Sequence, residues 1–301
     1  MAATPPQSGL NRKPPGPKPR ASYLVGLIGR GIQASKSPTM HRSEAAAQGF
    51  ELAYELLDFD QRGLPDESLP EVLNEAERRG FAGLNITYPY KQRVLPLLHD
   101  LSPEAQAIGA VNTIQLRDGR RIGYNTDASG FEESFRRGMP GAALNSVVQV
   151  GGGGAGAATA FAFLRLGVQR LTIVDIAFER AHALATDLQQ RFPEREVRAA
   201  QDLREIIAGA EGVLNATPLG MATHPGSAVP ADLLRPSLWV ADIVYFPIVT
   251  RLLSDARALG CRTLDGSGMV IFQAARAFEL FTGRAADGKR MQRHFETVTG
   301  E

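Results

Sequence analysis

Cysteine, net charge and long apolar runs are nearly absent from this sequence, and each lack excludes a class of protein. The 301-residue chain has one cysteine, Cys261, so an intrachain disulfide framework is excluded and a reducing compartment, the cytoplasm, is expected. No apolar run reaches the roughly 20 residues that a membrane span requires, so we expect no membrane association. Lysines and arginines number 33 against 32 aspartates and glutamates, and a net charge of +1 does not favour a nucleic-acid partner. A protein that acts on small molecules is therefore indicated.

Residues 1–21 differ in composition from the rest of the chain. They read MAATPPQSGLNRKPPGPKPRA, are rich in proline and basic residues, and lack the apolar stretch of a signal peptide. We expect a disordered arm, with a Pro-rich ligand segment as the alternative.

The first half of the remaining chain alternates strand and helix signals. Residues 22–29, 50–59 and 81–87 are predicted strands, and helices are expected at 37–49, 69–80 and 90–98. Ser37 would be the N-cap of the first helix and Pro38 its first residue. Such alternation predicts an α/β fold with a largely parallel sheet covered by helices. Two strand-like runs around Asp118 and Gly119 predict a hairpin.

The alternation resumes after a helix predicted from Ala128 to Gly138 and a Pro/Gly-rich turn. Further strands are expected at 146–150, 170–175, 212–217, 239–244 and 261–265. The stretch from Gly268 to Thr299 is predicted to form two helices that pack back on the first part of the chain. We therefore predict two α/β domains: residues 22–127 completed by the C-terminal helices at 267–301, and residues 128–266.

A glycine-rich turn follows the first strand of the second domain and opens an Ala-rich helix. Gly151, Gly153 and Gly156 have the spacing of a dinucleotide-binding turn, and Asp175 follows Gly156 by 19 positions, at the end of the next strand. Glycines let the backbone approach the pyrophosphate, which the helix N-terminus attracts. The carboxylate would bind the adenosine ribose hydroxyls and repel a 2′-phosphate, which predicts NAD over NADP, although Arg180 keeps a basic group nearby. The alternative is a glycine-rich turn that binds no ligand.

Polar side chains gather where the strands of the first domain end. Ser35 and Ser37 flank the beginning of a helix whose free amides favour an anion such as a carboxylate; alternatively, Ser37 is an ordinary N-cap and Ser35 a loop residue. In GLNITYPYK, Asn85 and Thr87 share one side of a strand end. Lys91 follows in the first turn of a predicted helix, where the dipole favours the neutral amine. Taken alone, Lys91 could equally be a solvated surface lysine.

Two more polar residues follow strands in GAVNTI and GYNTDASG. These are Asn112 and Asp127, and ligands of open α/β sheets bind beside such strand ends. Asp127 can also be interpreted as a helix N-cap.

The chain resembles the shikimate and quinate dehydrogenase family from about Tyr23 to about Gly283. The matching stretches are SKSPTMH, GLNITYPYK, GAVNT, YNTDASGF, the glycine-rich turn, NATPLGM, DIVYFPIVTRLL and GSGMVIFQAARAFELFTG. The resemblance implies an N-terminal α/β substrate domain, completed by the C-terminal helices, and a Rossmann dinucleotide-binding domain, with the active site in the cleft between them.

The resemblance also implies a role for each matching residue. Lys91 and Asp127 match the catalytic pair, and Ser35 and Ser37 match the hydroxyls that hold the substrate carboxylate. Residues that match contacts to the ring hydroxyls are Asn85, Thr87, Asn112 and Gln273, and Tyr245 lies at the cleft. Residues expected at the cofactor are Gly151, Gly153, Gly154, Ala155, Gly156, Asp175, Arg180, Thr217, Pro218, Gly268 and Met269. No metal site is implied.

Four positions depart from patterns seen in parts of the family. Asp175 and Ile176 stand where NADP-using members carry a neutral polar residue and then an arginine, which supports NAD. Ser37 stands where quinate-preferring members often have threonine, which favours activity on shikimate. Phe246 stands where many relatives have asparagine, with no effect that the sequence reveals.

We therefore predict an NAD-dependent enzyme of the shikimate pathway of aromatic amino acid biosynthesis, as a monomer or homodimer. It would interconvert shikimate and 3-dehydroshikimate, with quinate and 3-dehydroquinate as a second pair. Lys91 would accept or return the hydroxyl proton while the cofactor takes or gives hydride. Asp127 favours the charged lysine and the helix start the neutral one, and the sequence does not decide between them. Two alternatives stay open: a dehydrogenase of an amino or otherwise modified shikimate analogue, and a non-catalytic NAD-binding regulator.

Overall fold

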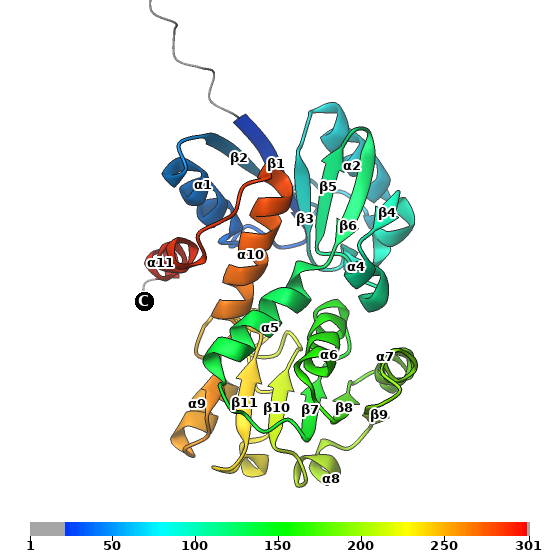
Figure 1. Ribbon diagram of the computed structural model, residues 1–301, viewed down its shortest axis with the longest axis vertical. Coiled ribbons are helices and arrows are strands. Elements are labelled where there is room, and N and C mark those ends of the chain that lie inside the picture. The colour runs from blue at the N-terminus through cyan, green and yellow to red at the C-terminus, as the bar shows by residue number, and fades with distance from the viewer. Residues whose placement is uncertain (1–21, 300–301) are drawn as a thin grey trace, which may run out of the picture.

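The computed structural model describes residues 22–299, which form two sheets stacked along the long axis of the molecule (Figure 1). The predicted disordered arm, residues 1–21, lies outside the described residues. The strands are β1 (Ser22–Gly29), β2 (Glu51–Asp58), β3 (Gly83–Ile86), β4 (Asp100–Leu101), β5 (Thr113–Arg117), β6 (Arg120–Tyr124), β7 (Ser146–Val150), β8 (Arg170–Val174), β9 (Glu196–Ala200), β10 (Gly212–Asn215), β11 (Trp239–Asp242) and β12 (Thr263–Leu264). We call the part built on β1–β6 the first lobe and the part built on β7–β12 the second lobe. The predicted α/β class is confirmed.

The helices surround both sheets. They are α1 (Ser37–Ala47), α2 (Leu69–Arg78), α3 (Tyr90–Arg93), α4 (Pro103–Ile108), α5 (Thr126–Gly138), α6 (Gly154–Leu166), α7 (Phe178–Arg191), α8 (Leu203–Ile207), α9 (Arg251–Ala258), α10 (Ser267–Thr282) and α11 (Gly288–Thr299).

The first sheet is mixed. Its strand order is β2-β1-β3-β5-β6-β4; β1 runs parallel to β2 and β3, whereas β5 runs antiparallel to β3 and β6. Asp118 at φ 52° and Gly119 at φ 71° form the turn between β5 and β6, because a tight hairpin turn needs left-handed backbone. The predicted hairpin is confirmed.

The second sheet is parallel throughout. Its strand order is β12-β11-β10-β7-β8-β9, which is the doubly wound order of a Rossmann domain. The order reverses between β7 and β10, and ligands of such sheets bind outside the carboxyl ends of the strands at that point. The glycine-rich turn follows β7 and therefore lies there.

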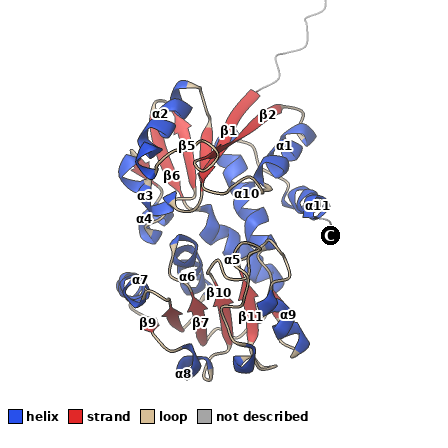
Figure 2. Ribbon diagram, turned by 180° about the vertical axis from the view of Figure 1, so that it is seen from behind, coloured by secondary structure: helices blue, strands red, loops and turns tan. Residues whose placement is uncertain are grey.

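Helices α5 and α10 cross between the two sheets (Figures 1 and 2). They pack closely because glycines face the partner helix: a Cβ added to Gly130 would lie 2.8 Å from Gln273 N, and one added to Gly268 would lie 2.3 Å from Ser134 Oγ. Farther along α10, Phe278 is buried in a core that also contains Val25 of β1. The C-terminal helices therefore pack on the first lobe.

The helix predicted at 90–98 is wrong in extent. α3 has only four residues, and a 3₁₀ turn, η2 (Leu95–Leu97), follows it. Pro96 explains the break, because proline lacks an amide hydrogen and disfavours helical backbone at the preceding residue. A single turn has little macrodipole, so the dipole argument for Lys91 loses its basis.

Two predicted N-caps are also wrong. Ser37 is the first residue of α1, and the N-cap is Lys36, which makes no side-chain cap. Asp127 is the second residue of α5; the N-cap is Asn125, whose side chain accepts hydrogen bonds from the amides of Asp127 and Ala128. Because Asn125 caps the helix, the Asp127 carboxylate is free for other partners.

A buried ion pair fastens α11 to α1. The Glu44 side chain is 0% exposed, and Arg290 Nε lies 2.6 Å from its Oε2. Burial opposes ionisation of Glu44, but hydrogen bonds from Arg290, Asp287 and Gln48 outweigh it and lower the pKa of Glu44. The C-terminal helix α11 is therefore held against α1 by the buried carboxylate of Glu44.

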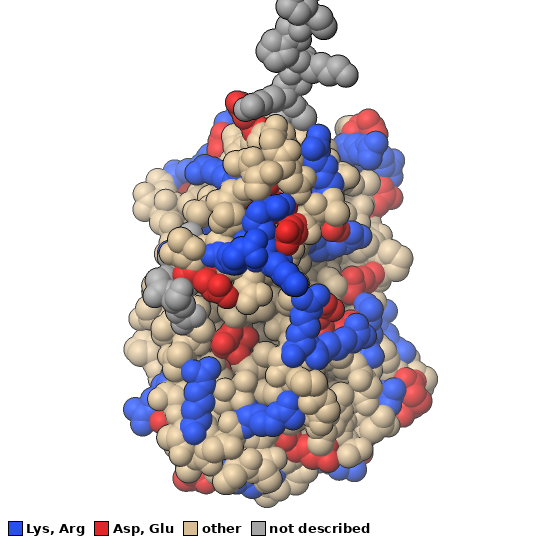
Figure 3. All heavy atoms as spheres, turned by 60° about the vertical axis from the view of Figure 1, so that its left-hand side comes forward, with Lys and Arg blue, Asp and Glu red and all other residues tan. Residues whose placement is uncertain are grey.

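No large region of one charge covers the face in Figure 3, where basic and acidic side chains are intermixed.

Within residues 22–299, none of the helices combines the length and the apolar character that crossing a membrane would need.

We predict that Arg290→Met destabilises the fold by about 3 kcal/mol at neutral pH, because it leaves a buried carboxylate without its cation. The folded pKa of Glu44 lies below its usual value of 4.5, so the stabilisation is complete above that pH and is lost as the pH falls through the folded pKa. Urea unfolding of wild type and variant should thus converge in acid.

The matched control is Arg276→Met, which removes an exposed pair with Glu279 on α10, with side chains 56% and 32% exposed. Its effect should stay under about 1 kcal/mol. Equal effects of the two substitutions would contradict the anchoring role of Glu44.

Candidate functional site

Lys91 and Asp127 form an ion pair at the centre of the site. Lys91 Nζ lies 2.5 Å from Asp127 Oδ2, and the side chains are 17% and 8% exposed. The other carboxylate oxygen, Oδ1, accepts a hydrogen bond of 2.8 Å from Asn112 Nδ2. The carboxylate is thus fixed on both oxygens, and the structure brings together Lys91 and Asp127, the two residues that match the family's catalytic pair.

The ion pair lies where the two lobes meet. Lys91 belongs to α3 of the first lobe, yet a Cβ added to Gly154 at the start of α6 would lie 3.4 Å from the Cβ and the Cδ of Lys91. The lysine stem therefore lies against the glycine-rich turn of the second lobe. A group bound at that turn would be next to the ammonium.

Asn85 is joined to the ion pair through side chains that the sequence analysis did not select. Asn85 is 6% exposed, its Oδ1 accepts 2.9 Å from the Tyr54 hydroxyl, and its Nδ2 donates 3.1 Å to Thr113 Oγ1. Tyr54 lies within a strand of mainly apolar residues, and Thr113 follows Asn112. The one sequence signal that could have identified them as site residues is a side-chain hydroxyl at a position expected to be buried. The structure joins Asn85 and Asn112 through Thr113.

The two predicted serines lie at the start of α1. Ser35 Oγ accepts a hydrogen bond of 3.3 Å from the Ser37 amide. Between them, Lys36 Nζ lies 5.8 Å from the centre of the Phe246 ring, which belongs to the second lobe. The aromatic ring that replaces asparagine therefore lies beside a cation at the predicted carboxylate site.

Tyr245 and Thr87 flank the same region. Burial, and then the negative charge of Asp127, raise the pKa of the half-buried Tyr245, so its hydroxyl lies within electrostatic reach of the ion pair. Thr87 packs over Gly29, where an added Cβ would lie 2.4 Å from Thr87 Cγ2.

Three predicted residues of α10 lie in the contact between helices. Gln273 packs against Gly130, one turn after Asp127, and its Nε2 donates 3.1 Å to Val270 O. Gly268 faces α5, and Met269 is 7% exposed within the core. The structure therefore gives Gly268 and Met269 a packing role; their contact with a cofactor stays a prediction.

The glycine-rich turn has the shape that a dinucleotide pyrophosphate needs. Gly151 has φ +107°, and a Cβ there would lie 2.7 Å from Ala216 O; a Cβ on Gly156 would lie 2.3 Å from Gly151 O. A Cβ on Gly153 would meet nothing within 4 Å, and no side chain caps α6. The free amides at the start of α6, at Gly154 and Ala155, fit an anionic group.

Asp175 follows β8 and lies against this turn. Its Oδ2 accepts 2.8 Å from the Gly152 amide and its Oδ1 accepts 2.9 Å from the Ala177 amide. Arg180 NH1 lies 3.6 Å from Asp175 Oδ2, with the arginine side chain 54% exposed. The Asp175 carboxylate, which two backbone amides hold in place, and the exposed Arg180 guanidinium therefore lie next to each other beside the glycine-rich turn.

The segment after β10 lies against the other side of the turn. Asn215 Oδ1 accepts from the Thr217 amide at 3.0 Å and from its hydroxyl at 2.7 Å, and Pro218 follows, exposed. Asn215 Nδ2 also donates 3.0 Å to Asp242, and burial raises the pKa of Asp242 to about 6. A Cβ on Gly151 would lie 2.9 Å from Thr217 Cγ2, so Thr217 borders the turn.

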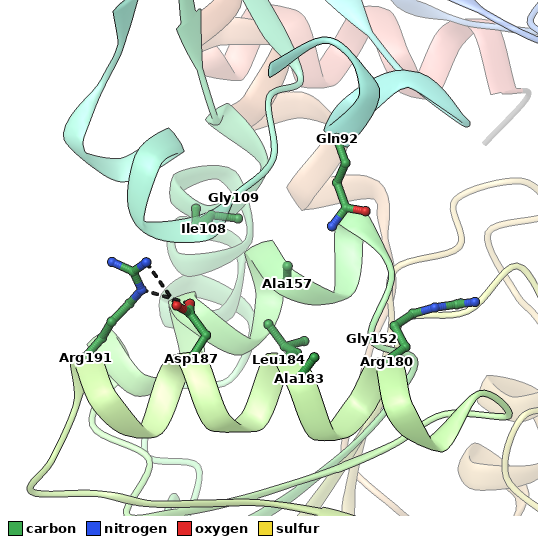
Figure 4. A pocket seen from close by; sticks show the side chains of 10 residues that line it. All are labelled: Gln92, Ile108, Gly109, Gly152, Ala157, Arg180, Ala183, Leu184, Asp187 and Arg191. Carbon is green, nitrogen blue, oxygen red and sulfur yellow. Dashed lines mark hydrogen bonds and ion pairs between the residues drawn. The ribbon is translucent and has the colours of Figure 1, made fainter. Parts of the chain in front are cut away.

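A pocket of about 290 Å³ opens beside the turn, between the lobes (Figure 4). Its lining comprises Gln92, Ile108, Gly109, Gly152, Ala157, Arg180, Ala183, Leu184, Asp187 and Arg191. Asp187 and Arg191 pair with each other, whereas Arg180 points away from them (Figure 4). The pocket adjoins the glycine-rich turn and does not include Lys91 or Asp127.

Comparison with known proteins agrees with this arrangement. Residues 27–114 match the shikimate dehydrogenase substrate binding domain, and residues 266–294 match the shikimate 5′-dehydrogenase C-terminal domain. A shikimate dehydrogenase (NADP(+)) of Streptomyces avermitilis is 51% identical over 281 residues, which are 93% of this chain and 97% of the relative. A quinate/shikimate dehydrogenase (NAD(+)) of Corynebacterium efficiens is 48% identical over 277 residues, 91% of this chain and 98% of the relative.

A solved structure agrees as well. The quinate dehydrogenase from Corynebacterium glutamicum in complex with NAD matches with a TM-score of 0.85 and 46% identity, covering 92% of this chain and 99% of that chain. The resemblance found in the sequence and the combination of a substrate domain with a Rossmann domain are thereby confirmed: the chain belongs to the shikimate dehydrogenase family.

Proposed function

We propose that the chain interconverts shikimate and 3-dehydroshikimate, and also quinate and 3-dehydroquinate, with NAD as the preferred cofactor and Lys91 as general acid and base. One observation carries the proposal: Lys91 Nζ lies 2.5 Å from Asp127 Oδ2, at the meeting of the lobes and beside the glycine-rich turn. A substrate bound there would thus lie between Lys91, which accepts the proton, and NAD at the glycine-rich turn, which accepts the hydride.

The glycine-rich turn would hold NAD, which would supply an acceptor for the hydride of the carbinol carbon. As that carbon becomes a carbonyl carbon, Lys91 in its amine form takes the hydroxyl proton; in the reverse direction the ammonium returns it. Asp127 holds Lys91 in place, and Asn112 fixes the carboxylate oxygen that faces away from the lysine. The lysine is 17% exposed, which allows it to exchange the proton with water.

The hydroxyls of Ser35 and Ser37, with the ammonium of Lys36, suit the substrate carboxylate. Asn85, Thr87, Asn112 and Gln273 are proposed to contact the ring hydroxyls, with Tyr245 closing the site from the second lobe. Ser37 stands where quinate-preferring members often have threonine, which supports shikimate as a substrate and quinate as a second one.

Asp175 supports the choice of NAD. A 2′-phosphate at this position would approach a carboxylate that backbone amides already hold in place. Because the exposed Arg180 could turn toward a phosphate, we propose weaker but measurable use of NADP. Gly268 and Met269, together with Thr217 and Pro218, are proposed to border the nicotinamide.

The substrate domain is proposed to comprise residues 22–127 and 267–301, and the dinucleotide-binding domain residues 128–266. Packing of Phe278 of α10 with Val25 of β1 supports that division. We propose a cytoplasmic enzyme that is a monomer or homodimer.

Initial rates with shikimate, quinate and an amino analogue, each with NAD and NADP, test the function. We expect turnover of both hydroxy acids with NAD, because Ser35 and Ser37 can hold the carboxylate that the acids share. Turnover of the amino analogue alone would favour the alternative substrate. NAD binding without turnover of any of these acids would favour a regulator.

Lys91→Met should lower kcat by about 10² to 10⁴, because it removes the proton acceptor and keeps the stem beside Gly154. The KM for NAD should change much less. Lys289→Met, at an exposed lysine of α11, is the control and should match wild type. Near-normal turnover by Lys91→Met would remove Lys91 from the role.

Asp175→Asn should lower the ratio of kcat/KM for NAD over NADP by about tenfold, the equivalent of about 1.4 kcal/mol. The charge that repels a 2′-phosphate is lost, whereas the size of the side chain is kept. Asp187→Asn, farther along α7 from Gly152 and Arg180 (Figure 4), is the control, since Asp187 pairs with Arg191. An unchanged ratio in Asp175→Asn would show that Asp175 does not face the ribose.

A further inference from the structure

A chain of four side-chain hydrogen bonds runs through the first lobe to the ion pair. The Tyr54 hydroxyl donates to Asn85 Oδ1 at 2.9 Å, and Asn85 Nδ2 donates to Thr113 Oγ1 at 3.1 Å. The Thr113 hydroxyl donates to Asn112 Oδ1 at 3.2 Å, and Asn112 Nδ2 donates to Asp127 Oδ1 at 2.8 Å. The chain spans β2, β3, β5 and α5.

Neighbouring groups of fixed character set the direction of every bond. The backbone carbonyl of Asn112 can only accept, and it faces Asn85 Nδ2 at 3.4 Å, so the amide group of Asn85 cannot be turned round. The Thr126 amide can only donate, and it faces Asn112 Oδ1 at 2.7 Å. The carboxylate of Asp127 accepts at the other end. Thr113 Oγ1 already accepts a hydrogen bond from Asn85 Nδ2. Its single hydroxyl hydrogen must therefore point toward Asn112 and Thr126.

All members of the chain are buried. Tyr54, Asn85, Thr113 and Asn112 are 2%, 6%, 0% and 3% exposed. Water competes little at such positions, and aligned bonds in low dielectric polarise one another. A change at Tyr54 can therefore reach Asp127 only through the hydrogen bonds between them if it acts along this chain.

We propose that Tyr54 and Thr113 are positioning residues that act through Asn85 and Asn112 to orient Asp127, and with it Lys91, for proton transfer. The proposal rests on the function proposed above. The two ends of the chain, Tyr54 and Asp127, would then be coupled.

Kinetics of four variants test the coupling. Tyr54→Phe and Thr113→Val should each lower kcat/KM for shikimate about fivefold, the equivalent of about 1 kcal/mol, with the KM for NAD unchanged. Combined, they should lose little more than Thr113→Val alone, because one interrupted chain cannot be interrupted again. Thr113→Ser restores the hydroxyl and should recover most of the loss.

Thr172→Val is the matched control, since Thr172 is a buried strand threonine of the second lobe, 2% exposed, whose hydroxyl oxygen accepts a hydrogen bond from the exposed Arg198. Losses that multiply in the double variant would overturn the proposal. So would a Thr113→Ser variant as impaired as Thr113→Val.

A second measurement does not depend on activity. In nitrogen-15 NMR spectra, the side-chain amide resonances of Asn112 should shift in Tyr54→Phe, although the bonds described above join Tyr54 to Asn112 only through Asn85 and Thr113, and should stay in place in Thr172→Val. Unmoved resonances in Tyr54→Phe would overturn the chain. A shift in an enzyme that turns over neither acid would keep the chain and reject the proposed function.

Discussion

The site depends on one carboxylate held on both sides. Asp127 receives the Lys91 ammonium on one oxygen and the Asn112 amide on the other; the contact with Asn112 is buried, and the Lys91 side chain is 17% exposed. A charge in such a place is stable only when its partners are fixed. Asn125 contributes by capping α5, which leaves Asp127 free to face the lysine. The position of the lysine is therefore determined by residues from α3, α5 and the strand ends between them.

The same constraint explains why the two lobes meet where they do. Helices α5 and α10 pack through glycines, and α5 begins at the ion pair and leads toward β7 of the second lobe. The glycine-rich turn after β7 then reaches the stem of Lys91. The doubly wound sheet has its binding edge at this turn. A dinucleotide bound there and Lys91, the proton acceptor, can therefore contact the same substrate molecule.

Several features could be predicted from the sequence, because they depend on local patterns. The alternation of strands and helices, the hairpin at Asp118, the glycine spacing and Asp175 after β8 need only the neighbouring residues. The charged edge strand β9 (EVRAA) was missed, since it lacks an apolar run. The helix from Tyr90 was predicted too long, because Pro96 was given too little weight.

The sequence by itself determined the α/β class, the dinucleotide turn and the residue types that could carry proton transfer. Only the tertiary structure decided which of them meet. Lys91 and Asp127 are 36 positions apart, and no local pattern states that α3 and α5 face each other. Tyr54 and Thr113 resembled ordinary strand residues until folding buried their hydroxyls. A buried polar group must find a partner, and the partners within reach join these two hydroxyls to Asn85, Asn112 and Thr126.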